Sequence, residues 1–125
     1  MKSELSPAQA ALRFGLEVTA MVAWAMAAWR AMPGTLASVV GSVGAVVVLA
    51  GLWGTFRVTG DASASGGAPV AVGGRTRLAL ELCLLLGAAV AAILTANARF
   101  GAVLGALVML HYATTPRRVR WLLER

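Results

Sequence analysis

The stretch Arg-Leu-Ala-Leu-Glu at residues 77–81 decides the fold, because residues 13–17 repeat its pattern as Arg-Phe-Gly-Leu-Glu. Each copy opens a long apolar run and places an arginine and a carboxylate four residues apart inside it. Charges at membrane depth are costly, so they are usually paired with one another or used in function. The repeated motif therefore predicts an internal duplication and a polar cluster to which both copies contribute.

The composition is that of a membrane protein. Of the 125 residues, 59% are hydrophobic and 13% are charged, whereas soluble domains average about 45–50% apolar and 25% charged residues. The net charge is +6, but most cations lie just outside apolar runs, where anionic lipid headgroups are the expected partners and nucleic acid is not. Cys83 is the single cysteine, so we expect no disulfide, no metal site and no cofactor.

Four apolar segments predict an all-α membrane protein with four transmembrane helices in a bundle, formed by one domain over residues 1–125. Ser6 and Pro7 are typical of a helix start, residues 32–34 of a tight hairpin, and Pro116 of a helix end. The expected helices cover residues 8–30, 36–56, 76–96 and 100–115.

Two other segments complete the predicted domain. Residues 59–74 are rich in Gly, Ala and Ser, which predicts a flexible linker outside the bilayer. Residues 117–125 combine basic side chains with Trp121 and leucines, which predicts a basic tail that lies along the headgroup layer.

The distribution of Lys and Arg predicts the orientation. Nine of the eleven lie near the termini or the linker, and only Arg30 and Arg99 lie in the two hairpins. The positive-inside rule then places both termini and Gly66 of the linker in the cytoplasm. Both motifs enter the membrane from that side, so the bundle is expected to consist of two parallel helical-hairpin repeats. The nine residues are Lys2, Arg13, Arg57, Arg75, Arg77, Arg117, Arg118, Arg120 and Arg125.

Six side chains from these helices form a candidate polar cluster or substrate site near the cytoplasmic side. Each glutamate lies about 6 Å deeper than its arginine, and the returning fourth helix reaches a similar level. Within one helix, arginine followed by glutamate is the poorer i,i+4 orientation, so we expect Arg13 to pair with Glu81 and Arg77 with Glu17. The candidate residues are Arg13, Glu17, Trp53, Arg77, Glu81 and His111.

Three interpretations of this cluster are open. The charges can hold the two halves together, Glu17 and Glu81 can form a substrate or ion site, or the arginines can simply reach the headgroups. His111 is expected to be a hydrogen-bonded helix residue, because a metal site with the two glutamates would lack a supporting Glu-x-x-His pair.

The chain resembles the YrdB family of small four-helix bacterial membrane proteins. The resemblance rests on residues 12–17, on Trp-Gly-x-Phe at 53–56, on residues 77–81 and on an apolar last helix that ends near His111. It implies a multi-pass protein of the bacterial cytoplasmic (inner) membrane, and it supplies no activity.

For the function, we expect a non-enzymatic membrane subunit or scaffold. The sequence has no paired nucleophile and base and no phosphate-binding loop. The alternatives are a small transporter or channel that uses Glu17 and Glu81, and a membrane enzyme that moves protons through a Glu/His layer. Glycines at helical spacing also predict a homo-oligomer, namely Gly41, Gly44, Gly51, Gly101 and Gly105.

Overall fold

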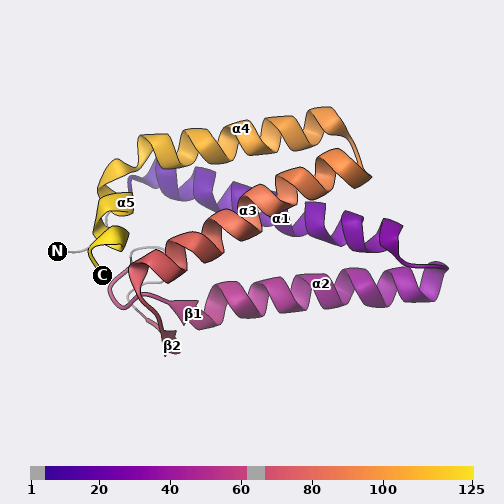
Figure 1. Ribbon diagram of the computed structural model, residues 1–125, viewed down its shortest axis with the longest axis horizontal. Coiled ribbons are helices and arrows are strands. Elements are labelled where there is room, and N and C mark those ends of the chain that lie inside the picture. Colours follow the sequence, from indigo (N-terminus) through magenta and orange to yellow (C-terminus); the bar gives the residue numbers. More distant parts are fainter. Residues whose placement is uncertain (1–4, 62–66) are drawn as a thin grey trace.

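The computed structural model describes residues 5–61 and 67–125. Over these ranges the chain forms five helices and one pair of very short strands (Figure 1). Lys2, the linker residues 62–66 and therefore the topology position Gly66 lie outside the described residues. The elements are α1 (Pro7–Ala31), α2 (Thr35–Thr55), β1 (Phe56–Arg57), β2 (Val70–Ala71), α3 (Gly74–Thr95), α4 (Ala98–Thr114) and α5 (Pro116–Leu123).

The helix ends follow from local chemistry. The Ser6 hydroxyl accepts a hydrogen bond from the Gln9 backbone at 3.2 Å, and the Gln9 side chain accepts one from the Ser6 backbone at 2.9 Å. This capping box, followed by a proline in the first turn, starts α1. Asn97 starts α4 in a related way, because its side chain accepts hydrogen bonds from the backbones of Arg99 and Phe100.

The four long helices run roughly along the long axis of the molecule as two hairpins, α1–α2 and α3–α4 (Figure 1). The helix α1 is central, because it packs against α2, α3 and α4. The buried core lies between α1, α3 and α4 and is made largely of alanine and leucine, which allows the helices to approach closely. Both ends of the described chain lie at the same end of the molecule.

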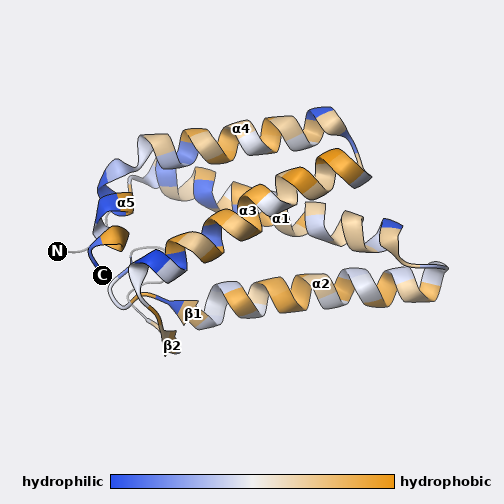
Figure 2. Ribbon diagram, viewed as in Figure 1, coloured by the Kyte–Doolittle hydropathy of each residue, from blue (hydrophilic) through white to orange (hydrophobic). Residues whose placement is uncertain are grey.

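Three of the helices, α1, α2 and α3, are long and apolar enough to cross a membrane. The helix α4 is also apolar but has only 17 residues (Figure 2). Each of the four expected helices begins and ends within two residues of the helix in the structure.

The glycines of α4 pack inside the chain. A Cβ atom at Gly101 would lie 2.6 Å from the carbonyl oxygen of Ala89 on α3, so only glycine permits this approach. Gly105 faces the Cβ of Ala89 at 3.5 Å. The Gly-x-x-x-Gly pattern of α4 therefore serves the contact between α3 and α4 within one chain. The homo-oligomer stays a prediction.

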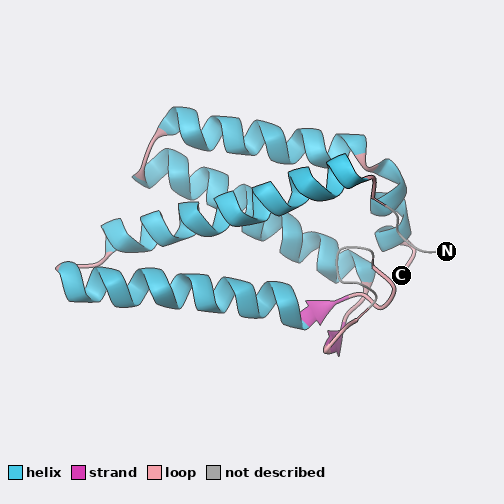
Figure 3. Ribbon diagram, turned by 180° about the vertical axis from the view of Figure 1, so that it is seen from behind, coloured by secondary structure: helices cyan, strands magenta, loops and turns pink. Residues whose placement is uncertain are grey.

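The basic tail does not lie free of the protein. It forms α5, which folds back against α3 at the end where α3 begins (Figures 1 and 3). Trp121 and Leu122 are buried in a small apolar cluster with Val58. The apolar face of α5 thus packs against the protein, while Arg117 and Arg120 are exposed. That the segment lies along the headgroup layer stays a prediction.

The prediction that residues 59–74 form a flexible linker is wrong in part. Asp61, near the start of this segment, is buried, as is Val58 just before it, and Gly60 has a left-handed backbone with φ of 87°. Further along, Val70–Ala71 pairs in parallel with Phe56–Arg57 as β2 and β1. These contacts place the Asp61 carboxylate inside the protein beside α5.

Candidate functional site

The carboxylate of Glu81 on α3 is the centre of a buried charged cluster. Its side chain has 0% exposure, and it accepts hydrogen bonds from four side chains. Arg13 donates from Nη2 at 2.6 Å and Nη1 at 3.4 Å, and Arg77 donates from Nε at 2.9 Å. Arg118 donates from Nη1 at 3.0 Å and Nη2 at 2.8 Å, and the Tyr112 hydroxyl donates at 2.7 Å.

Two further carboxylates balance the arginines. Arg118 forms a bidentate pair with Asp61, with Nε 3.1 Å from Oδ1 and Nη2 2.6 Å from Oδ2. The Nε of Arg13 lies 3.1 Å from Glu17 Oε1, an ion-pair distance without hydrogen-bond geometry. Three guanidinium groups thus face three carboxylates, which is the condition under which buried charges are tolerated. We call Arg13, Asp61, Arg77, Glu81, Tyr112 and Arg118 the Glu81 cluster.

Trp53, near the end of α2, lies against this cluster. The guanidinium carbons of Arg77 and Arg13 lie 4.7 and 5.3 Å from the centre of its ring, within cation–π range. Arg77 also donates from Nη1 to the backbone oxygens of Trp53, at 2.8 Å, and of Phe56. These carbonyls lie at the C-terminal end of α2, where a cation is favoured by the helix dipole.

The structure contains one of the two expected pairs across the halves. Arg13 contacts Glu81, but Arg77 pairs with Glu81 in its own helix rather than with Glu17. The prediction for Arg77 is wrong because its guanidinium lies between Glu81 and the carbonyls of α2, and it is held from both sides. Glu17 pairs with Arg13 in its own helix and is 19% exposed.

His111 on α4 is fully buried next to Tyr112, whose ring centre lies 5.2 Å away. Among the described residues, neither ring nitrogen of His111 has a hydrogen-bond partner, so the expected hydrogen-bonded histidine is not found there. Nor do the described residues contain a group of three or more His, Cys, Asp or Glu that could hold a metal ion.

Sequence reasoning missed Asp61 and Arg118. Asp61 was taken for part of a flexible linker, and Arg118 for a headgroup contact. A signal for α5 was present, because Arg118, Trp121 and Leu122 follow Pro116 at the i, i+3, i+4 spacing of one helical face. In the structure these three are the buried residues of α5.

Burial alone would lower the pKa of Arg118, which lies outside the long helices. Its hydrogen bonds to Glu81, the charge of Glu81 and its pairing with Asp61 together raise the pKa above the ordinary value. Arg118 is therefore cationic at every physiological pH.

The arrangement favours holding helices together over binding a substrate. Six donor contacts from four side chains fall on the two oxygens of Glu81, although a carboxylate offers about four lone-pair sites. The donors come from α1, α3, α4 and α5, and Arg77 extends the connection to α2. One carboxylate thus links all five helices.

The fold and the site define a class: a small helical protein with three helices long and apolar enough to cross a membrane, and with a charged cluster buried where α1 and α3 begin. Residues 11–109 match a family described as "Protein of unknown function (DUF2568)", and the chain belongs to that family. It is 36% identical over 115 residues to "Uncharacterized protein YrdB" of Bacillus subtilis (strain 168), which covers 91% of this chain and 92% of the relative. The resemblance to the YrdB family is confirmed. No solved structure matches the chain.

Proposed function

We propose that the protein is a four-pass protein of the bacterial cytoplasmic membrane that acts as a non-enzymatic subunit or scaffold, with both termini in the cytoplasm. Its two helical hairpins are proposed to be parallel repeats, each of which begins with an Arg-x-x-Leu-Glu motif. In support, both motifs lie at the beginning of their helices, and both ends of the described chain lie at that end of the molecule.

This proposal rests on the Glu81 carboxylate, whose hydrogen-bond acceptor positions are all taken by protein side chains. A carboxylate that binds a substrate or ion needs a free oxygen lone pair, or a partner that can leave. Three arginines and a tyrosine donate hydrogen bonds to Glu81. Each of these arginines also has a second partner, which is a carboxylate or a backbone carbonyl. Those contacts favour a fixed, structural cluster.

A scaffold needs a surface for a partner, and α2 offers one. Of the 21 residues of α2, all of which the structure describes, Ser38 alone is buried. Hydrogen bonds connect α2 to α1. In one of them, Ser42 Oγ of α2 donates to the carbonyl of Ala25 of α1 at 3.0 Å. Gly44 and Gly51, seven residues apart, have open space where a Cβ would lie. We propose that a second copy of the chain packs on this face of α2 by close helix contact.

Disulfide cross-linking in membranes tests the dimer. In a Cys83→Ala background, Gly44→Cys or Gly51→Cys should give a cross-linked dimer on mild oxidation. Val90→Cys is the control, because Val90 is 54% exposed but lies on α3. Equal cross-linking at position 90, or none at 44 and 51, would contradict the proposed surface.

A small transporter or channel is the second candidate, and one observation favours it. Glu17 borders a cavity of about 10 Å³ together with Trp24 and Trp53, which is room for a single water. Glu17 is the charged group of this lining, and it is the group that a proton or a small ion would contact there. Flux of protons or small ions across liposomes that depends on Glu17 and is lost in Glu17→Gln would establish this role over the scaffold.

A further inference from the structure

A polar cavity lies where the start of α1 meets the junction of α4 and α5. Its volume is about 480 Å³, and its lining includes Ser6, Gln9, Thr114 and Arg117. Gln9 Nε2 donates to the Thr114 carbonyl at 2.8 Å and so joins α1 to α4 at the cavity. Arg117 is exposed, and no carboxylate lines the cavity in the part of the chain that the structure describes.

An apolar groove lies between the same two helices. Its volume is about 370 Å³, and it is lined by residues such as Leu12 and Thr19 of α1 and Val103 and Leu107 of α4. Gly15 forms part of its wall, and no other atom lies within 4 Å of the place where its Cβ would be. A larger side chain at residue 15 would therefore extend into the groove.

Cavity and groove follow each other along one seam. On α1, Gln9 lines the cavity and residues from Ala11 to Thr19 line the groove. On α4, Thr114 lines the cavity and residues from Leu107 back to Phe100 line the groove. From Gln9 to Thr19 the helix rises about 15 Å, which is half of a hydrocarbon core about 30 Å thick. With the start of α1 at the membrane surface, the polar, cationic cavity would lie at headgroup level and the apolar groove below it would reach to mid-membrane.

We propose that this seam binds one anionic phospholipid, with its phosphate beside Arg117 and one acyl chain in the groove at Gly15. The polar cavity suits the headgroup of such a lipid, and the apolar groove suits its acyl chain. Within the described residues the lining contains no carboxylate and two arginines, of which Arg118 is already paired with Asp61 and Glu81. Arg117 is thus the cation offered to a ligand, and it selects a negative headgroup. This inference rests on the membrane location proposed above.

Native mass spectrometry of the full chain in detergent measures the binding. The probes are phosphatidylglycerol, phosphatidylcholine with the same acyl chains, and glycerol 3-phosphate. Phosphatidylglycerol should bind about fivefold more tightly than phosphatidylcholine, the ratio expected for one arginine at an anionic headgroup. Glycerol 3-phosphate, which lacks acyl chains, should not bind.

Matched variants test each half of the site. Arg117→Gln should abolish the preference for phosphatidylglycerol, whereas Arg120→Gln, an exposed arginine of the same helix outside the cavity, should retain it. Gly15→Leu should weaken binding of both lipids by filling the groove. Ala106→Leu, which adds one carbon fewer and lies on an exposed part of α4 outside the groove lining, should leave binding unchanged.

Equal binding of the two lipids that neither variant changes would overturn the inference, because the lipid would then be annular only. Binding of glycerol 3-phosphate as tight as that of phosphatidylglycerol would overturn it as well, because it would show a phosphate site without a chain site. A chain that stays soluble without detergent would refute the membrane location itself. Loss of the lipid preference alone would leave that location standing.

Discussion

Two glutamates in the same sequence motif have different surroundings in this protein. Glu81 is fully buried and accepts hydrogen bonds from four side chains, whereas Glu17 is 19% exposed and has its ion pair with Arg13. The difference comes from α5, because Arg118 reaches the α3 copy of the motif. The glutamate of the second motif is therefore the centre of the buried cluster, and the glutamate of the first motif forms an ion pair at its edge.

This asymmetry predicts unequal costs of removing the two charges. Glu81→Gln leaves three buried arginines short of an anion and should lower the free energy of unfolding by about 3 to 5 kcal/mol. Glu17→Gln removes one partly exposed pair and should cost about 1 kcal/mol or less. Chemical denaturation in mild detergent, followed by circular dichroism, measures both. Equal losses would show that the two glutamates contribute equally to the free energy of unfolding.

A double variant separates the partners of Glu81. Arg13→Gln combined with Glu81→Gln removes one stranded cation, but Arg77 remains without a carboxylate and Arg118 keeps only Asp61. The double variant should therefore recover only part of the stability lost in Glu81→Gln, on the order of 1 to 2 kcal/mol. Full recovery would mean that Arg13 alone pairs with Glu81 in solution.

At the scale of elements, α5 is the least expected part of the fold. Its docking depends on the backbone of α3, because a Cβ at Gly74 would collide with the carbonyl of Leu122. The backbone N–H of Gly74 also donates to the carbonyl of Arg125 at 2.9 Å. The glycine that begins α3 thus permits the contact that brings Arg118 to Glu81.

Gly74→Ala should therefore displace α5 and cost about 1 to 3 kcal/mol through overpacking. Gly73→Ala is the matched control, since a Cβ there would meet its nearest atom, the Arg125 carbonyl oxygen, at an ordinary 3.6 Å. Limited trypsin digestion gives a local readout, because Arg118 is buried only while α5 is docked. Faster cleavage after Arg118 is expected in Gly74→Ala alone, and equal protection in both variants would contradict the role of this glycine.

The sequence predicts the long helices and the Arg13–Glu81 contact, because apolar length, caps and helix spacing are local signals. It does not predict the partners of Arg118. Asp61 is 57 positions away in a segment of linker composition, so no local pattern connects the two. Asp61 is recognised as a member of the Glu81 cluster only from the folded structure, where it lies against Arg118.

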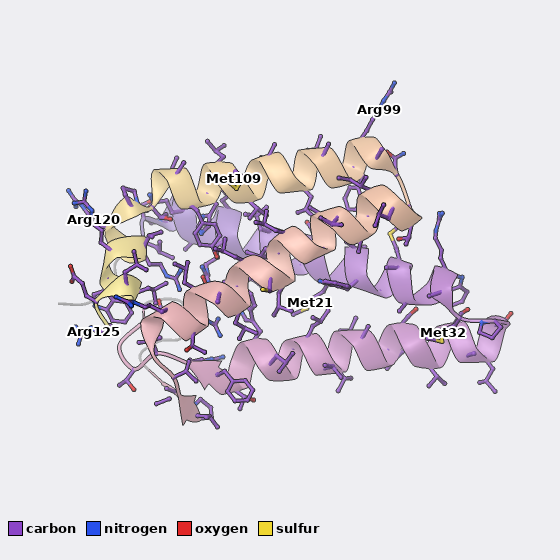
Figure 4. The ribbon with its side chains drawn as sticks, viewed as in Figure 1. Met21, Met32, Arg99, Met109, Arg120 and Arg125 are labelled. Carbon is purple, nitrogen blue, oxygen red and sulfur yellow. The ribbon has the colours of Figure 1, made fainter. Side chains whose placement is uncertain are left out.

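At the scale of the whole molecule, the cations lie unevenly at its two ends. Arg120 and Arg125 lie at the end where the chain starts and finishes, and Arg99 lies at the opposite end (Figure 4). Without Arg13, Arg77 and Arg118, which pair inside the protein, six Lys and Arg on the side of the termini still face two on the hairpin side. The charge bias on which the proposed orientation rests is therefore retained when the paired arginines are left out.

Reporter fusions test this orientation and the crossing of α4 together. With 17 residues, α4 rises about 25 Å, a few ångströms short of the hydrocarbon core. A small mismatch of this kind is relieved by local thinning and by side chains such as Arg99 that reach the headgroups. We expect periplasmic signals from fusions after residues 34 and 97 and a cytoplasmic signal after residue 125. If α4 did not cross, positions 97 and 125 would both report the periplasm, and if the charge bias were misread, the signals at 34 and 125 would be exchanged.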